Sequence, residues 1–334
     1  MNTRSPVALW GLLAVLLVVV ATVSLGVGTA FIPPARALAA LFGHGDPIAV
    51  AIIGQIRLPR ALLALIVGGV LGLSGAALQG YLRNPLAEPS TLGLSNSAAL
   101  GGVIALYFGF AENSDWALPL FAIATALGAT LVLMALVRIS DSAVTLILGG
   151  IAMGTLAGAA ISLALNLSSN PFAALEIAFW LLGSVEDRSM QQVWLVLPFA
   201  AVSVVLFLWD RKALDALTLG EETAKSLGFN LRAVQLRLMA AVALGVGACV
   251  AVSGSIGFVG LVVPHILRPL AGSRPSRLLI PSALAGAVLL TAADVLVRAV
   301  PTTNELKLGV VTAFLGTPFF MHLLFRARRP LGEP

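Results

Sequence analysis

The sequence predicts an all-α membrane protein with ten transmembrane helices, and composition and charge spacing carry that prediction. The chain has 334 residues, of which 59% are hydrophobic and 10% are charged. A water-soluble domain of this size carries roughly 25% charged residues. Since 59% of 334 is about 197 residues and a spanning helix needs about 20, the apolar content suffices for about ten helices. We expect a single transmembrane domain over residues 1–334.

The expected helices are the apolar runs between charged residues. Two long runs must be divided, one near Ser168 and one near Ser253, because turn-forming residues lie there. The eighth span is short enough to be broken or partly re-entrant. In chain order the spans are Leu9–Ile32, Ala61–Tyr81, Leu92–Phe110, Trp116–Val137, Val144–Leu165, Val193–Leu208, Leu231–Val252, Phe258–Leu270, Leu278–Ala299 and Leu308–Phe325.

The positions of Lys and Arg predict the orientation. Ten spans put both termini on one side, and placing them in the cytoplasm leaves fourteen of the 20 cations inside and six outside. The apolar run that follows Arg4 is too long for a signal peptide, so we expect an uncleaved first helix. The longest strongly polar segment, Asp210 to Arg237, is then cytoplasmic.

Several classes of function are excluded by what the sequence contains. In a membrane protein, an excess of 20 Lys and Arg over 15 Asp and Glu marks cytoplasmic loops, so we expect no nucleic-acid partner. The single cysteine, Cys249, allows no disulfide within the chain and no cysteine-based metal site. No GxxxxGK[ST] motif is present, since none of Lys212, Lys225 and Lys307 follows a glycine. No catalytic constellation is found either, and we expect neither an enzyme nor a bound cofactor or metal.

The spans contain few ionisable residues. Asp294 lies near the end of the ninth span, four residues before Arg298. Because ion-coupled carriers usually place such groups at mid-membrane, this shortage argues against a secondary carrier. A carrier or channel that works without ATPase subunits remains the alternative. Uphill transport by this chain would otherwise need another subunit to supply the work.

A stripe of small residues follows one face of the fifth span. It comprises Gly150, Gly154 and Gly158 at four-residue spacing, continued by Ser162 and Asn166. Small residues allow close helix packing, whereas polar groups on a bundle face also suit a water-filled path. Both interpretations stay open for this stripe, whereas the glycines of the second span favour packing.

A short helix is expected within the polar segment, over the residues TLGEETAKSLGFN. Glu221 and Glu222 would lie in its first turn, where negative charge suits the helix dipole, and Gly228 would end it. From these residues alone, an ordinary loop helix is favoured over a docking site for an energy-supplying subunit.

Four stretches resemble the FecCD family of ABC-importer permeases, which take up iron–siderophore complexes, haem and vitamin B12. They cover most of the chain from the second span onward and include motifs such as RNPLAEPSTLG and SGSIGFVGLVVPH. The stretches are Arg57–Gly101, Leu219–Gly228, Ser253–Gly272 and Ser282–Phe320.

The resemblance implies a type II ABC importer permease fold in the bacterial inner membrane. It implies a homodimer, two cytoplasmic ATPase subunits that bind ATP and Mg²⁺, and a periplasmic binding protein. The translocation path would lie at the dimer interface along the fifth and tenth spans, so the stripe becomes a candidate lining. The cytoplasmic segment 210–231 resembles the family's coupling segment, whose candidate contacts are Glu221, Glu222, Ala224, Leu227 and Gly228.

The resemblance also implies that Arg57, Arg60 and Arg298 dock the binding protein by pairing with its glutamates. A three-residue spacing could place Arg57 and Arg60 on one face. Interfacial anchoring is the alternative, but docking is favoured because these outside cations break the positive-inside pattern and arginine suits carboxylates.

Gate positions follow from the same resemblance. They are Asn84 and Leu86 after the second span, and Ser142, Ala143 and Val144 at the start of the fifth. Small hydroxyl residues are expected in the second group, where this chain reads Ser-Ala-Val. His265 and His322 are interpreted as interfacial residues rather than haem ligands. The ligand stays open, with siderophore or haem ranked slightly ahead of cobalamin on breadth of family use.

Overall fold

A computed structural model of the chain describes residues 6–327, apart from residues 29, 140–142, 273, 301, 303 and 304. Every regular element in these ranges is a helix, which confirms the all-α prediction. The elements are α1 (Pro6–Gly26), α2 (Pro34–Leu41), α3 (Pro47–Ala51), the π-helix η1 (Ile52–Arg57), α4 (Leu58–Leu82), α5 (Leu94–Tyr107), α6 (Phe110–Asn113), α7 (Ala117–Ile139), α8 (Ala143–Asn166), α9 (Pro171–Leu181), α10 (Met190–Trp209), α11 (Arg211–Leu217), α12 (Glu221–Ser226), α13 (Leu231–Ser253), α14 (Val259–Ala271), α15 (Pro275–Ala299) and α16 (Leu308–Ala327).

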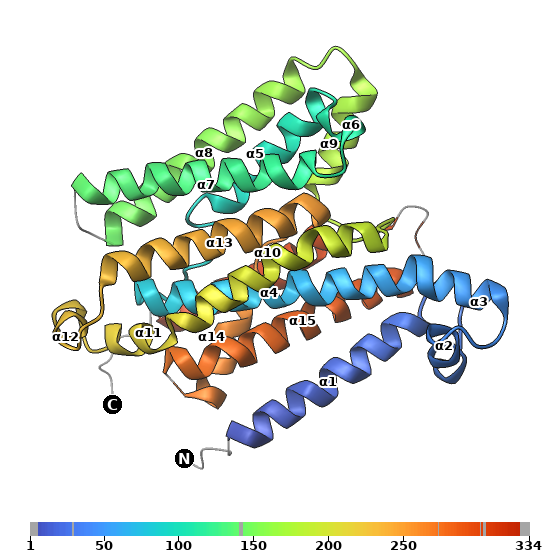
Figure 1. Cartoon of the computed structure of the whole chain (residues 1–334), viewed down its shortest axis with the longest axis horizontal. Coiled ribbons are helices and arrows are strands. Elements are labelled where there is room, and N and C mark those ends of the chain that lie inside the picture. Colours follow the sequence, from blue (N-terminus) through green and yellow to red (C-terminus); the bar gives the residue numbers. More distant parts are fainter. Residues whose placement is uncertain are drawn as a thin grey trace.

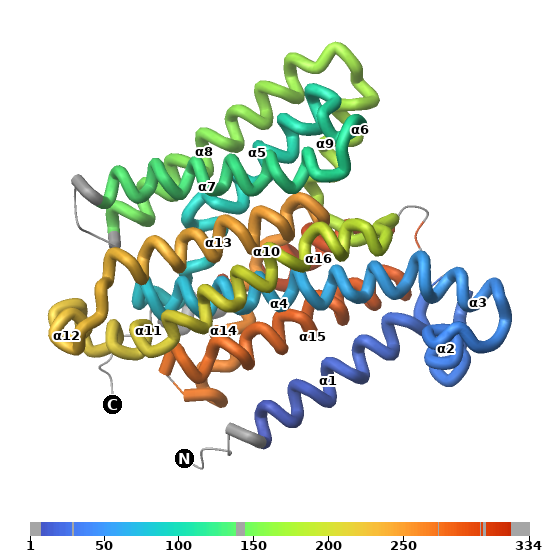
Figure 2. Tube along the Cα trace, viewed as in Figure 1, coloured from blue at the N-terminus to red at the C-terminus, as the bar shows by residue number. Residues whose placement is uncertain are grey.

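The long helices lie roughly side by side in three groups (Figure 1). Helices α5, α7 and α8 pack together along one edge, and α13 joins them to α4 and α10 in the middle. Helices α14, α15 and α1 form the other edge. The trace in Figure 2 places α12 at one end of the bundle and α2 and α3 at the opposite end. Helices α4 and α13 run in opposite directions through the centre and are mostly buried, whereas α1 is mostly exposed.

Each of the ten expected spans coincides with a helix. By length and composition, seven helices in the described ranges could cross a membrane. The third, eighth and tenth expected spans form the shorter apolar helices Leu94–Tyr107, Val259–Ala271 and Leu308–Met321. The number of ten transmembrane helices therefore stays a prediction.

The expected helix ends hold in two places and fail in one. The divisions near Ser168 and Ser253 are confirmed, because α8 ends at Asn166 and α13 ends at Ser253. The first helix was expected to reach Ile32 but ends at Gly26, where arginine side chains bind its last carbonyl groups. Helix α9 was not anticipated.

Glycines bring α4 against α15 and α14 at backbone contact distance. A Cβ atom on Gly72 would lie 2.2 Å from the carbonyl oxygen of Ser282, and one on Gly75 would lie 1.9 Å from that of Gly260. Both neighbours are backbone atoms of a packed helix. Backbone atoms cannot rotate away from an added methyl group as a flexible side chain can. The interpretation of these glycines as helix-packing positions is confirmed.

Replacing Gly72 with Ala is expected to destabilise the protein by about 1–3 kcal/mol, because the added methyl group forces α4 and α15 apart. Gly69→Ala on the same helix is the matched control, since its Cβ would meet the nearest atom at 3.5 Å, an ordinary contact. The measurement is thermal unfolding of the purified chain in detergent. Equal unfolding temperatures for the two variants would contradict the packing described here.

Candidate functional site

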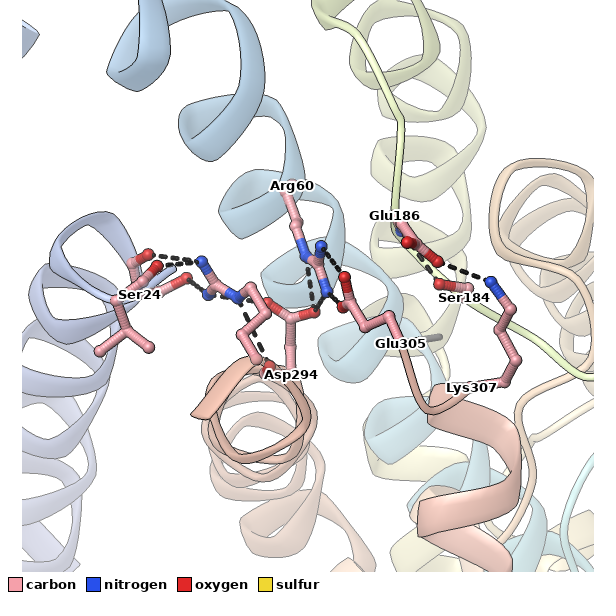
Figure 3. Close-up of polar contacts among 9 residues, drawn as sticks. Ser24, Arg60, Ser184, Glu186, Asp294, Glu305 and Lys307 are labelled. Carbon is pink, nitrogen blue, oxygen red and sulfur yellow. Dashed lines mark hydrogen bonds and ion pairs between the residues drawn. The ribbon is translucent and has the colours of Figure 1, made fainter. Parts of the chain in front are cut away.

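Five charged side chains meet at the end of the bundle opposite α12, and we call them the charge cluster. They come from the end of η1, the start of α4, the end of α15 and the segment before α16, as Figures 1 and 3 show in part. The cluster consists of Arg57, Arg60, Asp294, Arg298 and Glu305.

Arg60 lies at the centre of the cluster between two carboxylates (Figure 3). Its Nε donates to Oδ1 of Asp294 at 2.9 Å, and its two terminal nitrogens donate to the two carboxylate oxygens of Glu305. Asp294 is 0% exposed and Arg60 is 7% exposed. Such buried ions hold together only as a hydrogen-bonded set, because removing one partner leaves another charge unpaired in a poorly solvated place.

Arg298 ties α1 to α15. Its Nη1 donates to the carbonyl oxygens of Ser24 and Val27 at 2.9 and 2.8 Å, and its Nη2 donates to Oγ of Ser24 at 2.7 Å. The same guanidinium pairs with Oδ2 of Asp294 at 2.8 Å, so this carboxylate joins Arg298 to Arg60. Carbonyl groups at a helix C-terminus lack helical partners, and here arginine donors satisfy them.

Arg57 differs from the other two arginines because its described partners are all backbone carbonyl groups. Nη1 donates to the carbonyl oxygens of Leu25 and Gly26, both at 2.8 Å, and Nη2 donates to that of Ala30. The segment that follows α1 passes so close that a Cβ on Gly28 would lie 2.7 Å from Nη2 of Arg57. Among the described residues Arg57 forms no ion pair, so three guanidiniums face two carboxylates and the cluster has an excess positive charge.

The expectation that Arg57 and Arg60 share one face is not met by their contacts. Arg57 ends a π-helical turn and points to the end of α1, whereas Arg60 points to α15 and Glu305. Both are buried, so neither guanidinium stands free at the surface in this conformation. Their docking role stays a prediction.

Glu305 was not anticipated from the sequence. Burial alone would raise the pKa of its carboxyl group, but the hydrogen bond from Arg60 and the charges of Arg60 and Arg298 hold the pKa below its ordinary value. A second link lies beside it, since Nζ of Lys307 contacts Oε2 of Glu186 at 2.6 Å (Figure 3). These contacts fix the segment that leads into α16 against α4 and the α9–α10 connection.

The stripe on α8 divides into two parts. A Cβ on Gly150 would lie 2.5 Å from Cα of Leu92, and one on Gly154 would lie 3.1 Å from Cα of Gly93, so these two glycines pack against the α4–α5 connection. A Cβ on Gly158 would meet nothing within 4 Å, and Ser162 and Asn166 are exposed. The packing interpretation therefore holds for Gly150 and Gly154, and path lining stays a prediction for Gly158, Ser162 and Asn166.

The predicted gate residues lie in two separate segments. Oδ1 of Asn84 accepts a hydrogen bond from the amide of Leu86 at 2.9 Å, which shapes the turn after α4. Val144 is 61% exposed in the first turn of α8, where Ala143 begins the helix. Ser142 lies outside the described residues. No contact that joins the two segments is described, and the gate stays a prediction.

Glu88 is a buried carboxylate in the α4–α5 connection that sequence reasoning missed. Its Oε1 accepts from Oγ of Ser90 at 2.5 Å. Burial raises the pKa of Glu88, against the effect of hydrogen bonds from Ser90 and from the backbone of Phe258 and Leu261. This residue attaches the connection to the start of α14.

The segment 210–231, the predicted coupling segment, forms two short helices, of which α12 was expected and α11 was not. Of the five candidate contacts, Ala224 is 0% exposed and packs inward, whereas Leu227 is 60% exposed. Glu221 and Glu222 are exposed in the first turn of α12, and Gly228 follows the helix with a positive φ of 87°. The predicted helix and its stop are confirmed.

One ion pair and two hydrogen bonds to a serine anchor this segment to the bundle. Asp210 accepts two hydrogen bonds from Arg237, at 2.8 and 2.5 Å. Asp215 accepts from the amide and Oγ of Ser276 at 2.9 and 2.6 Å, which ties α11 to the start of α15. The exposed face of α12 is thus held in a defined position relative to the spanning helices.

Taken together, these features define a multi-pass membrane protein built from helices. The chain belongs to the FecCD transport family, whose family model matches residues 16–326. It is 41% identical to the vitamin B12 import system permease protein BtuC of Salmonella typhimurium. The aligned region has 323 residues and covers 96% of each protein. It is 42% identical to YvrB, an uncharacterised ABC transporter permease protein of Bacillus subtilis. The aligned region has 292 residues and covers 86% of this chain and 82% of YvrB.

A solved structure has the same fold. It is described as a metal-chelate type ABC transporter in an inward-facing conformation. Its TM-score is 0.85 at 32% sequence identity, and the match covers 96% of this chain and 99% of that chain. Permeases of this family work with ATP-binding subunits and a substrate-binding protein, and those of the BtuC type sit in the bacterial inner membrane.

Glu305→Gln is expected to lower the free energy of unfolding at pH 7 by about 1.5–3 kcal/mol, because it weakens a hydrogen bond to a charged group. A depressed carboxyl pKa stabilises the folded state above the ordinary value of 4.5, and this contribution disappears as the pH falls through the lower folded value. The difference between wild type and variant should therefore shrink on acidification below pH 4.5. Chemical unfolding in detergent across pH measures it.

The control for this variant is Glu112→Gln, at an exposed residue without an ion pair among the described residues. It should unfold like the wild type at every pH. A Glu305→Gln protein as stable as the wild type at pH 7 would show that Glu305 does not hold the charge cluster together.

Proposed function

We propose that the chain is the permease subunit of an ABC importer that moves a metal chelate across the bacterial inner membrane. The similarity to BtuC along nearly the whole chain, together with the 0.85 TM-score to a metal-chelate type importer, carries this proposal. The chain makes and breaks no bond in its cargo. ATP hydrolysis on two partner subunits drives the change between inward-open and outward-open states.

Two copies of the chain form the permease, and the path lies between them. The second half of the stripe on α8 faces open space, and large apolar side chains are exposed near it and on α16. Leu156 is 63% exposed and Phe314 is 76% exposed. A second copy would cover such side chains and leave Gly158, Ser162 and Asn166 beside the passage.

The end of the bundle that carries α12 faces the cytoplasm and the ATPase subunits. The first turn of α12 is acidic, an exposed apolar residue, Leu227, follows its last turn, and the segment is anchored through Asp210 and Asp215. These contacts suit a rigid element that transmits force. With α12 inside, α1 also begins on the cytoplasmic side (Figure 1), in keeping with ten spans and cytoplasmic termini.

Cobalamin is the first candidate for the cargo, followed by iron–siderophore complexes and haem. Several BtuC proteins match at about 41% identity over almost the full length, and this outweighs the ranking by breadth of family use alone. All three cargo classes are large chelates. A path lined by Gly, Ser and Asn suits all three classes. These three residue types carry no charge that would select one class of cargo over another.

Uptake by cells tests the cargo. The chain, expressed with the ATPase and binding-protein subunits of its own system in a strain without its own vitamin B12 permease, should restore uptake of labelled cyanocobalamin at least tenfold over background. Ferrichrome and haemin are tested in the same way. Restored uptake of ferrichrome or haemin alone would replace cobalamin as the cargo, and uptake of none of the three would refute the proposal.

We propose that the charge cluster attracts an acidic binding protein, because Arg57 gives the cluster an excess positive charge although its own side chain is buried. Arg57→Glu should lower uptake at least tenfold while membrane insertion stays normal. Arg36→Glu is the control, at an exposed cation on α2 at the same end of the bundle. Equal uptake by the Arg57→Glu variant and the wild type would refute the docking role.

A further inference from the structure

A cavity of about 740 Å³ lies at the α12 end of the bundle, between the end of α4, α7, α12 and the start of α13. Its size falls within the range of about 300–1,000 Å³ that is typical of small-molecule sites. None of the residues discussed for the path lines it. It is therefore a separate space, beside the coupling segment rather than on the path.

One half of the cavity is apolar and opens toward the lipid. Leu131 and Met134 of α7 and Leu236 of α13 line it. Leu131 is 66% exposed and Leu236 is 47% exposed, and both helices are long and apolar enough to span a membrane. These side chains lie on α7 and α13 rather than on α8 and α16, where a second copy is proposed, so they are placed to contact acyl chains of the bilayer.

The other half is positively charged. Three cations line it, and Glu221 is the single acidic residue among its lining residues. Arg83 pairs with Glu221 at 3.2 Å, with both side chains about half exposed. A second cation, Lys225, pairs with Glu222 at 2.9 Å. The exposed Arg232 also lines the cavity and forms no ion pair within the described part of the chain, so it gives this half a net positive charge.

Arg83 is held in an unusual backbone conformation. Arg83 directly follows Leu82, the last residue of α4, and its φ is 51°. This value lies in the left-handed region, which glycine adopts without strain. A strained non-glycine residue at a helix end points to a use for its side chain. Here the side chain of Arg83 lines the cavity, where it pairs with Glu221.

We propose that this cavity binds one anionic phospholipid. Its phosphate lies between Arg83 and Arg232, and its acyl chains follow Leu131 and Leu236 along α7 and α13. Basic pockets between transmembrane helices at the membrane surface bind anionic headgroups in this way. Because α12 forms one wall, the bound lipid also holds the coupling segment against the bundle. The proposal does not depend on the identity of the cargo.

The test compares lipids retained by the purified full-length chain. Native mass spectrometry from micelles with equal amounts of phosphatidylglycerol and phosphatidylcholine should show a preference for phosphatidylglycerol. The double variant Arg83→Gly, Arg232→Gln should weaken its binding about 30-fold, the equivalent of about 1 kcal/mol for each cation. Glycine suits the backbone at position 83, so the variant should fold at least as stably as the wild type without lipid.

Arg211→Gln is the matched control, because this exposed cation lies on α11 outside the cavity lining. It should retain phosphatidylglycerol like the wild type. Three outcomes would overturn the proposal. The first is unchanged retention of phosphatidylglycerol by the double variant. The second is that inorganic phosphate protects the wild-type chain from unfolding as well as phosphatidylglycerol does. The third is loss of ATPase co-purification in the double variant without loss of lipid.

Discussion

The buried carboxylate of Asp294 is the contact on which the arrangement of this end of the bundle depends. It lies between the guanidiniums of Arg60 and Arg298, which in turn hold Glu305 and the last carbonyl groups of α1. Charges removed from water are stable only when each has its partners, so the set acts as one unit. That unit fixes α1, α4, α15 and the segment before α16 relative to one another.

Helix α4 links this unit to the opposite end of the protein. It begins beside the charge cluster and packs against α15 through the backbone contact at Gly72. It ends at Leu82, and the next residue, Arg83, pairs with Glu221 of α12. Close packing between backbones leaves little room for one helix to slide on the other. The two helices therefore behave as one stiff layer between the proposed docking end and the proposed coupling end, as rigid-body switching in a transporter requires.

The sequence was sufficient to predict the helices but not their contacts. Apolar runs between charges located every long helix. Helix α9 was missed because no charged residue separates it from α8 and because Glu176 lies within it, and α2 and α3 are too short. The pattern of outside cations singled out Arg60, but its carboxylate partners lie 234 and 245 positions away in the chain. Equal four-residue spacing also could not show that Gly150 packs against Leu92 while Gly158 stays open, because the neighbouring segment decides the difference.

Permeases of this family work with ATP-binding subunits, so the proposed importer takes its energy from outside this chain. The most direct measurement compares accumulation of labelled cyanocobalamin in sealed vesicles that hold the permease alone, under proton and sodium gradients, with vesicles that also hold its ATPase and binding protein. Accumulation should require all three components and ATP. Concentrative uptake by the permease alone, driven by either gradient, would contradict an ATP-dependent importer.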